Sequence, residues 1–280
     1  MEKWPIGIFT SVGAGLGAGL DTVRALGIHT VQLHSPHGPE RTPERVAHFR
    51  KQFADAGVQV TVVFAGFEGE SYADIPTVQR TVGLVPADTR AERLQETKDI
   101  ADFAEGIGCD VLGMHIGFVP EDRGDRTYIA IVAAAREICD YCQTKGQRFH
   151  LETGQEKADV LLRFFQDVSR ENLAINFDPA NLILYGADEP IPALRMVGKH
   201  VKSVHCKDAK WARNPGREWG QEVPLGQGDV NIPLFLRTLK DIGYVGPLTI
   251  EREIIGEQQR KDIAEAIALL QRLRAAILGD

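Results

Sequence analysis

Four short apolar segments of the sequence end in residues that commonly bind divalent metals. The segments are Arg148–Glu152, Leu173–Asp178, Val201–His205 and Pro247–Glu251, so the residues that end them are Glu152, Asp178, His205 and Glu251. Three carboxylates and one imidazole form a mostly hard, oxygen-rich set, which favours Mn²⁺, Mg²⁺ or Co²⁺ with five or six ligands over a closed structural zinc site. Such an ion keeps open positions that two substrate oxygens could fill.

The spacing of these four residues indicates how they could meet. The successive gaps are 26, 27 and 46 residues (178 − 152, 205 − 178, 251 − 205). The first two match one strand-helix unit, and the third matches one unit plus a long loop. A single carboxylate at a strand end is often only a helix N-cap, and a single histidine there is often a structural hydrogen-bonding group. Four such residues at the ends of consecutive strands predict one shared metal site.

Strand-like and helix-like segments alternate along the chain, which predicts an α/β fold with a parallel sheet. Eight units in 280 residues, about 35 residues each (280/8), is the density of a (β/α)8 TIM barrel. The expected strands are Pro5–Thr10, Thr30–Leu33, Val58–Phe64, Asp110–His115, Arg148–Glu152, Leu173–Asp178, Val201–His205 and Pro247–Glu251. The expected helices are Leu20–Leu26, Pro43–Ala56, Asp88–Ile107, Thr127–Lys145, Lys157–Val168, Pro190–Val197, Ile232–Ile242 and Gln258–Leu278. We expect residues 1–280 to form a single domain, because no linker or shift in composition divides them.

An open, doubly wound sheet is the alternative architecture. The barrel is favoured because a closed barrel brings the carboxyl ends of all its strands together, where the four metal-type residues lie. The segments 65–86 and 209–231 are long for loops between a strand and a helix, and loops of this kind often carry binding function. The glycine-rich segment 11–19 lacks the spacing of a dinucleotide-binding motif, so we interpret it as a loop over the barrel mouth.

Composition and charge limit the partners. The net charge of −7 disfavours binding to a phosphate backbone, so we expect no nucleic acid partner. We expect no membrane association, because no apolar run approaches the ~20 residues of a membrane span. The N-terminal segment has no signal-peptide pattern, which predicts a cytoplasmic protein with its four cysteines reduced.

Several motifs together resemble those of the xylose-isomerase-like TIM-barrel superfamily. They are HLETG at 150–154, NFDPAN at 176–181, VHCKDAK at 204–210, PLGQGD at 224–229, TIERE at 249–253 and GMHIG at 113–117. The resemblance is to its sugar and sugar-phosphate isomerases and epimerases, and the superfamily's members include D-tagatose 3-epimerase, hydroxypyruvate isomerase, inosose dehydratase and endonuclease IV. The resemblance implies that Glu152, Asp178, His205 and Glu251 hold one divalent ion, with Mn²⁺ favoured and Mg²⁺, Co²⁺ or Zn²⁺ as alternatives. It also implies a homo-oligomer.

The endonuclease IV branch differs from this chain at the ligands for its additional zinc ions. That branch has a histidine three residues after the strand-six aspartate, where this chain has Asn181. It also has an Asp-x-His pair shortly before its L-G-x-G motif, where this chain reads Gly220-Gln221-Glu222. These departures, together with the negative net charge, argue against DNA repair.

The resemblance implies a metal-dependent isomerase or epimerase in carbohydrate metabolism that acts on a sugar or a sugar phosphate. An ion chelated by a carbonyl and an adjacent hydroxyl makes the neighbouring C–H more acidic and stabilises the ene-diolate. Glu152 and Glu251 would be the acid/base pair as well as ligands. Two alternatives remain: a lyase similar to inosose dehydratases, which eliminates a β-leaving group after the same proton abstraction, and a non-catalytic sugar-binding protein.

Candidate substrate-binding residues follow the strands and occupy the two long loops. They are His34, His115, Lys207, Glu68, Trp211, Arg213 and Arg217, with Glu70, Tyr72, Trp219 and Glu222 as further specificity candidates. Aromatic rings suit the C–H faces of sugars, and arginines suit phosphate or carboxylate groups. For each of them a structural or solvated role is the alternative. Gly226-Gln227-Gly228 precedes a helix, where it could cradle a phosphate or form a tight turn.

Overall fold

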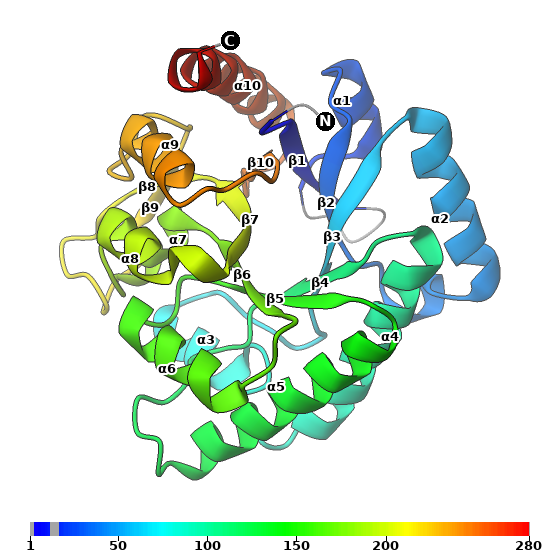
Figure 1. The fold of residues 1–280 in the computed structure, drawn as a ribbon, viewed down its shortest axis with the longest axis vertical. Helices are drawn as coiled ribbons and strands as arrows, with labels where there is room; N and C mark the ends of the chain where they lie inside the picture. Colours follow the sequence, from blue (N-terminus) through cyan, green and yellow to red (C-terminus); the bar gives the residue numbers. More distant parts are fainter. Residues whose placement is uncertain (1–2, 12–16, 280) are drawn as a thin grey trace.

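The computed structural model describes residues 3–11 and 17–279, and it contains a closed barrel of eight parallel strands (Figure 1). The strand order around the barrel is β1-β10-β7-β6-β5-β4-β3-β2. The strands are β1 (Ile6–Ser11), β2 (Thr30–His34), β3 (Gln59–Ala65), β4 (Val111–Met114), β5 (Arg148–Glu152), β6 (Leu173–Phe177), β7 (Val201–Cys206) and β10 (Leu248–Ile250). The α/β barrel is therefore confirmed, and the open sheet is excluded.

Helices surround the barrel and cover its outer face (Figure 1). They are α1 (Leu20–Ala25), α2 (Pro43–Ala56), α4 (Arg90–Ile107), α5 (Arg126–Thr144), α6 (Ala158–Val168), α8 (Pro190–Val197), α9 (Ile232–Asp241) and α10 (Glu257–Leu278). The predicted strands and helices end within two residues of the observed ones. Part of the glycine-rich segment interpreted as a mouth loop, residues 12–16, lies outside the described residues.

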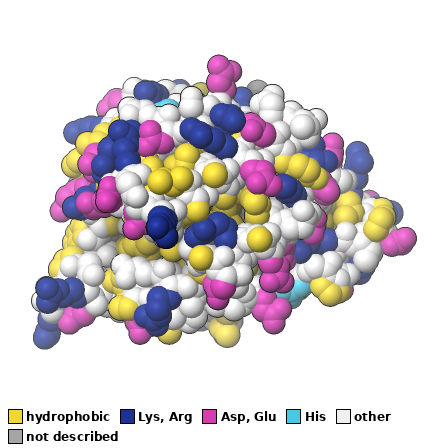
Figure 2. Space-filling view, turned by 90° about the horizontal axis from the view of Figure 1, so that it is seen from below, with side chains coloured by type: hydrophobic (Ala, Val, Ile, Leu, Met, Phe, Trp, Pro, Cys, Tyr) yellow, Lys and Arg dark blue, Asp and Glu magenta, His cyan; other side chains and the backbone are white. Residues whose placement is uncertain are grey.

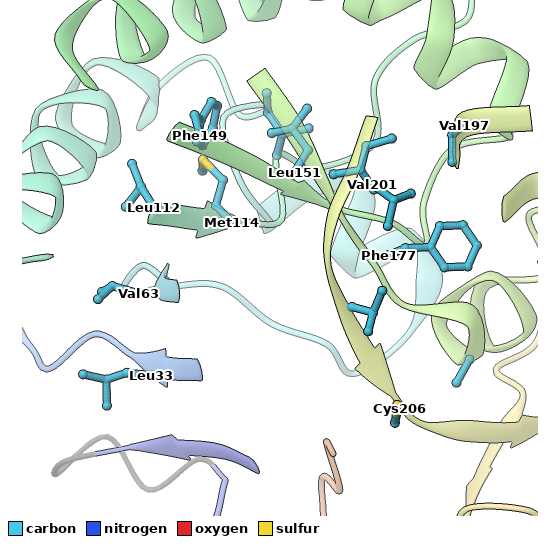
Figure 3. Close-up of a cluster of buried hydrophobic side chains, with 14 of the residues drawn as sticks. Leu33, Val63, Leu112, Met114, Phe149, Leu151, Phe177, Val197, Val201 and Cys206 are labelled. Atoms are coloured by element: carbon cyan, nitrogen blue, oxygen red, sulfur yellow. The ribbon is translucent and has the colours of Figure 1, made fainter. Parts of the chain in front are cut away.

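The two faces of each strand pack differently, and this sets the direction of the site residues. Figure 3 shows Leu151, Phe177 and Cys206, which are buried in the apolar cluster between the strands and the surrounding helices. The Phe177 ring stacks on Phe235 of α9, with 6.3 Å between the centroids. Because successive side chains of a strand point to opposite faces, the residues next to these three point into the barrel. Glu152, Asp178 and His205 therefore face its interior.

Short elements occupy the stretches that the sequence predicts as loops. The segment 65–86 contains α3 (Ile75–Thr81), which begins where the Asp74 carboxylate accepts a hydrogen bond of 2.7 Å from the Thr77 amide. Segment 209–231 contributes to an antiparallel hairpin of β8 (Asp208–Lys210) and β9 (Gln221–Val223). Helix α7 (Pro179–Tyr185) follows β6 directly. These additions build walls at the end of the barrel where the strands terminate.

The outer surface mixes charges of both signs. On the face drawn in Figure 2, acidic and basic side chains are interspersed with smaller hydrophobic patches. Within the described residues, no helix combines the length and apolar character needed to cross a membrane.

Candidate metal centre

The four predicted ligands meet at the carboxyl ends of four neighbouring strands. Glu152 ends β5, Asp178 follows β6, His205 lies in β7 and Glu251 follows β10. One ligand atom from each lies within 4.8 Å of the others, and all four side chains are buried. The fold thus brings together residues that are 99 positions apart in the sequence (251 − 152).

One nitrogen of His205 is the point on which the three carboxylates converge. Its Nδ1 lies 2.9 Å from Glu152 Oε1, 3.4 Å from Asp178 Oδ2 and 3.3 Å from Glu251 Oε2. Ligand atoms that bind one ion at ~2.1 Å and at roughly 90 to 110° to each other lie about 3.0 to 3.4 Å apart. The three distances from His205 Nδ1 to the carboxylate oxygens are thus close to the separations in a coordination shell, and all four donor atoms lie within 4.8 Å of one another.

Asp178 divides its two oxygens between the backbone and the centre. Its Oδ1 accepts hydrogen bonds from the amides of Ala180 and Asn181, at 2.8 and 3.0 Å, and so caps the N-terminus of α7. Its Oδ2 is buried and makes no hydrogen bond, although His205 Nδ1 lies 3.4 Å and Lys207 Nζ 3.9 Å away. A buried carboxylate oxygen without a partner is costly, and a divalent ion would satisfy it. The residues present therefore fit a metal.

The opposite charges around the centre stabilise one another's ionised forms. Burial by itself lowers the pKa of His205, but the adjacent Glu251 and Glu152 carboxylates outweigh it and raise that pKa well above its usual value. Burial likewise favours neutral Glu251, yet His205 and Lys207 hold its pKa well below the usual range. Lys207 Nζ lies 2.9 Å from Glu251 Oε2 and 3.1 Å from Glu253 Oε1. The cluster thus balances several carboxylates against few cations, and a metal ion would add the missing positive charge.

Gln32 of β2 is a contributor to this centre that the sequence interpretation missed. Its Oε1 lies 2.6 Å from His205 Nε2, while its Nε2 donates to Asn176 Oδ1 at 3.2 Å and to the Val204 carbonyl at 3.5 Å. Because an amide oxygen only accepts, His205 Nε2 must carry a hydrogen, so Nδ1 is the nitrogen that would give its lone pair to an ion once it has lost its own proton. Metal-binding histidines are commonly oriented by such a partner on the other ring nitrogen.

Replacing Gln32 by leucine is expected to weaken Mn²⁺ binding about 10- to 100-fold, the usual effect of losing a partner behind a metal ligand. Gln32→Glu is expected to retain the affinity, because a carboxylate also accepts from His205 Nε2 and Asn176 Nδ2 is free of other partners. Isothermal titration of the two purified variants with Mn²⁺ measures this difference. A wild-type dissociation constant for Gln32→Leu would show that His205 needs no support from Gln32.

A polar layer lies beneath the ligands inside the barrel. Each of its members precedes a ligand by two positions in the sequence; the members are His150, Asn176, Ser203 and Thr249. His150 Nδ1 pairs with Ser203 Oγ at 2.8 Å, and burial lowers the pKa of His150 to about 3, so its ring is neutral. Polar residues at alternating positions of otherwise apolar strands were a signal for this layer that the sequence interpretation did not use.

A cavity of about 1200 Å³ opens above the centre and contains several of the predicted substrate residues. His34, His115 and Glu68 line it, as do Glu152 and Glu251. The His115 Nε2 lies 3.2 Å from Glu152 Oε2. In His34, Nδ1 lies 3.0 Å from the Ser35 carbonyl oxygen, and burial lowers the pKa of the ring. Both histidines are therefore placed to contact a bound molecule.

The remaining predicted substrate residues lie elsewhere. Lys207 is buried behind the centre, where it contacts Glu251, Glu253 and Asn181 rather than the cavity. The exposed Arg213 and Arg217 and the half-buried Trp211 are not among the residues that line the cavity. Four further specificity candidates do line it, namely Glu70, Tyr72, Trp219 and Glu222.

Glu156 is a second residue that the sequence interpretation missed. It lies four positions after Glu152 but outside the cavity lining, and its Oε1 accepts a 3.0 Å hydrogen bond from the Val119 amide. Burial raises the pKa of Glu156 to about 8, because no cation offsets the desolvation of its carboxylate. It is therefore a neutral structural group at neutral pH.

Replacing Glu156 by glutamine is expected to raise the free energy of unfolding at pH 8 by about 1 to 4 kcal/mol and to change little near pH 4. Between the unfolded pKa of about 4.3 and the folded pKa of about 8, the folded state keeps a proton that the unfolded chain has lost. Wild-type stability therefore falls as the pH rises through this window, whereas glutamine has no proton to lose. Urea denaturation at several pH values measures the gap, and the exposed Glu171→Gln is the control. A gap independent of pH would contradict the assignment.

Comparison with known proteins assigns this chain to a family. A family model described as "Xylose isomerase-like TIM barrel" matches residues 20–273. The chain belongs to that family. It is similar over its full length to the xylose isomerase domain protein from Planctomyces limnophilus, with 54% identity, complete coverage of both chains and a TM-score of 0.98.

More distant structures share the fold of this xylose isomerase-like barrel. A xylose isomerase-like TIM barrel protein from Mycobacterium smegmatis, solved in complex with magnesium, is 20% identical over 99% of this chain and 100% of that chain, with a TM-score of 0.71. A D-tagatose 3-epimerase-like protein is 17% identical over 99% of both chains, with a TM-score of 0.75. Among curated proteins, the uncharacterized protein YihM of Escherichia coli is 28% identical over 159 residues, which is 56% of this chain and 48% of YihM. The match thus spans about half the length of that relative.

Proposed function

We propose that this protein is a divalent-metal-dependent sugar isomerase or epimerase, with Glu152, Asp178, His205 and Glu251 as its metal ligands and Glu152 and Glu251 as its acid/base pair. The observation that carries the proposal is the convergence of three carboxylates on His205 Nδ1 at ligand-like separations, at the base of an open cavity. The similarity to epimerase structures supports the same class of reaction. A bound ion would supply Lewis-acid polarisation of a substrate carbonyl.

The residues around the centre suit the proton transfers of such a reaction. His205 and Lys207 hold Glu251 as a carboxylate, which is the form that a base requires. Glu152 contacts His115 through Oε2 and Asn181 through Oε1, and both partners restrict its orientation. Because both glutamates reach the cavity, one can remove a proton while the other returns one. The position of that return decides between epimerisation and isomerisation.

The test is exchange of substrate C–H for deuterium in D₂O, with the protein loaded with Mn²⁺ and with ketoses as substrates. Exchange that depends on the metal, together with an epimer or an aldose as product, supports the proposal. A product lighter by one water assigns the lyase instead. Metal-dependent binding of a ketose without any exchange assigns a sugar-binding protein.

A further inference from the structure

The cavity above the centre is larger than one monosaccharide requires. Its volume of about 1200 Å³ exceeds the roughly 300 to 1,000 Å³ of pockets that enclose drug-sized ligands. Its floor is the buried pair Glu152 and Glu251, each 8% exposed, and its rim includes Tyr72 and Ile255, which are 46% and 82% exposed. A molecule chelated at the floor by one end would therefore leave an outer compartment to fill.

The arginines that line this cavity are all committed to partners within the protein. Arg41 pairs with Glu96 at 2.6 Å, and Arg252 pairs with Glu222 at 2.8 Å and with Asp262 at 2.7 Å. Arg93 donates to the carbonyls of residues 81, 83 and 68 and lies over the Phe67 ring. Among the described residues, the lining therefore presents no arginine or lysine that is unengaged.

The turn at Gly226-Gln227-Gly228, considered above as a phosphate cradle, already binds the carboxylate of Asp208. The Asp208 carboxylate accepts hydrogen bonds from the amides of Gly226 and Gly228, at 2.9 and 3.0 Å, and from the amide of Val230 at 3.2 Å. A Cβ on Gly228 would lie 2.2 Å from Asp208 Oδ1, which shows how closely the turn wraps this side chain. Because the Asp208 carboxylate takes the place of a phosphate at these amides, the segment is a tight turn rather than a phosphate site.

The net charge of the cavity lining also disfavours an anionic substrate. Eight glutamates and three arginines are among the described residues that line the cavity, a formal charge of −5 (3 − 8). A divalent ion at the floor would leave −3 (−5 + 2). Like charges repel in a partly dehydrated cleft, so a phosphate or carboxylate on the substrate would lose affinity.

Four aromatic side chains line the cavity, from the buried Tyr185 and Phe67 to the half-buried Trp219 and the exposed Tyr72. The rings of Tyr185 and Trp219 lie 4.6 Å apart between centroids and both line the cavity, as do Tyr72 and Phe67. Aromatic faces next to polar groups suit the C–H faces of a sugar ring or a planar aglycone. Trp219 and Tyr72, the two that are not buried, give the outer compartment the chemistry of a second ring site.

We infer that the substrate is an uncharged sugar that carries a second ring beyond its carbonyl end, such as a disaccharide-sized ketose or a keto-glycoside. This inference rests on the proposed function, because chelation at the floor orients the carbonyl end inward. The part of the sugar farthest from the carbonyl then lies against the aromatic wall near Trp219.

Three ketoses that share the chelating carbons C1 to C3 test the inference: D-fructose, isomaltulose and D-fructose 6-phosphate. The last two carry a neutral glucosyl ring or a phosphate on the same O6. Titration of Mn²⁺-loaded protein is expected to give at least tenfold tighter binding for isomaltulose than for fructose and weaker binding for the phosphate. Trp219→Ala is expected to reduce the isomaltulose affinity about five- to tenfold through loss of ring stacking, and to leave fructose unchanged.

The outcomes separate this inference from the proposed function. Metal-dependent binding that is tightest for fructose 6-phosphate, or equal for fructose and isomaltulose, would overturn the inference and leave a ketose site standing. Equal loss of fructose and isomaltulose affinity in Trp219→Ala would overturn the second ring site. Failure of all three ketoses to bind in the presence of Mn²⁺ would count against the proposed function and against the inference that rests on it.

Discussion

Under the proposed function, glutamine at position 152 or at position 251 is expected to reduce turnover by about 10³-fold or more, since each change would remove a proton carrier and weaken a ligand. Glutamine retains the shape of glutamate and one oxygen, so the hydrogen bonds from Asn181 to residue 152 and from Lys207 to residue 251 can persist. The measurement is the rate of deuterium incorporation into the substrate, at saturating Mn²⁺ so that reduced metal affinity does not mask the loss.

Glu156→Gln is the matched control for these two variants. It makes the same chemical change four positions after Glu152, at a carboxyl that is already protonated and that does not reach the cavity. We expect its turnover to equal that of the wild type. Full activity in Glu152→Gln or in Glu251→Gln would contradict the assignment of that glutamate as an acid or base, whatever the metal content of the variant.

Loss of the bound metal is the expected result of His205→Ala. The wild type is expected to carry about one divalent ion per chain after dialysis against Mn²⁺, and the variant close to none, because the nitrogen on which all three carboxylates converge is removed. Inductively coupled plasma mass spectrometry of the dialysed proteins measures this content. The exposed His48→Ala is the control and should retain the metal.

Stability gives a second measure of the same substitution. Without His205 and without metal, buried carboxylates face each other with less compensating positive charge, and breaking such a buried cluster typically costs about 3 to 5 kcal/mol. If His205→Ala does not fold, Asp178→Asn provides the test, because its amide can still accept the two capping hydrogen bonds through its oxygen. Undiminished metal content in a folded variant of either kind would contradict the proposed centre.

The sequence predicted the barrel and the convergence of its four strand ends well, because both follow from short-range patterns. Alternating apolar residues place Leu151, Phe177 and Cys206 on the outer face, so the polar residues beside them had to face the interior. Helices α3 and α7, of seven residues each, were missed because they lie in stretches that the sequence interpretation left as loops. Asp74 and Asp178, each followed by a proline within two residues, were their available signals.

The walls of the cavity could not be predicted in the same way. Arg213 and Arg217 have side chains suited to anions, yet they lie outside the cavity, because the path of a 23-residue connection (231 − 209 + 1) depends on tertiary contacts. Gln32, a polar residue between the apolar Val31 and Leu33, was missed because nothing in its own strand identifies its partner. Its role appears only when the barrel closes and places it next to a residue 173 positions away.

Asp178 uses one carboxylate oxygen for the backbone and directs the other to the centre, so we expect this position not to tolerate glutamate. Glutamate binds the same metals as aspartate, but one additional methylene cannot keep one oxygen on the first amides of α7 and the other at the centre. One side chain, Asp178, thus both caps the N-terminus of α7 and supplies a proposed metal ligand. Because α7 carries Asn181, Leu184 and Tyr185 to the cavity wall, the residue that starts this part of the wall is also one of the four proposed metal ligands.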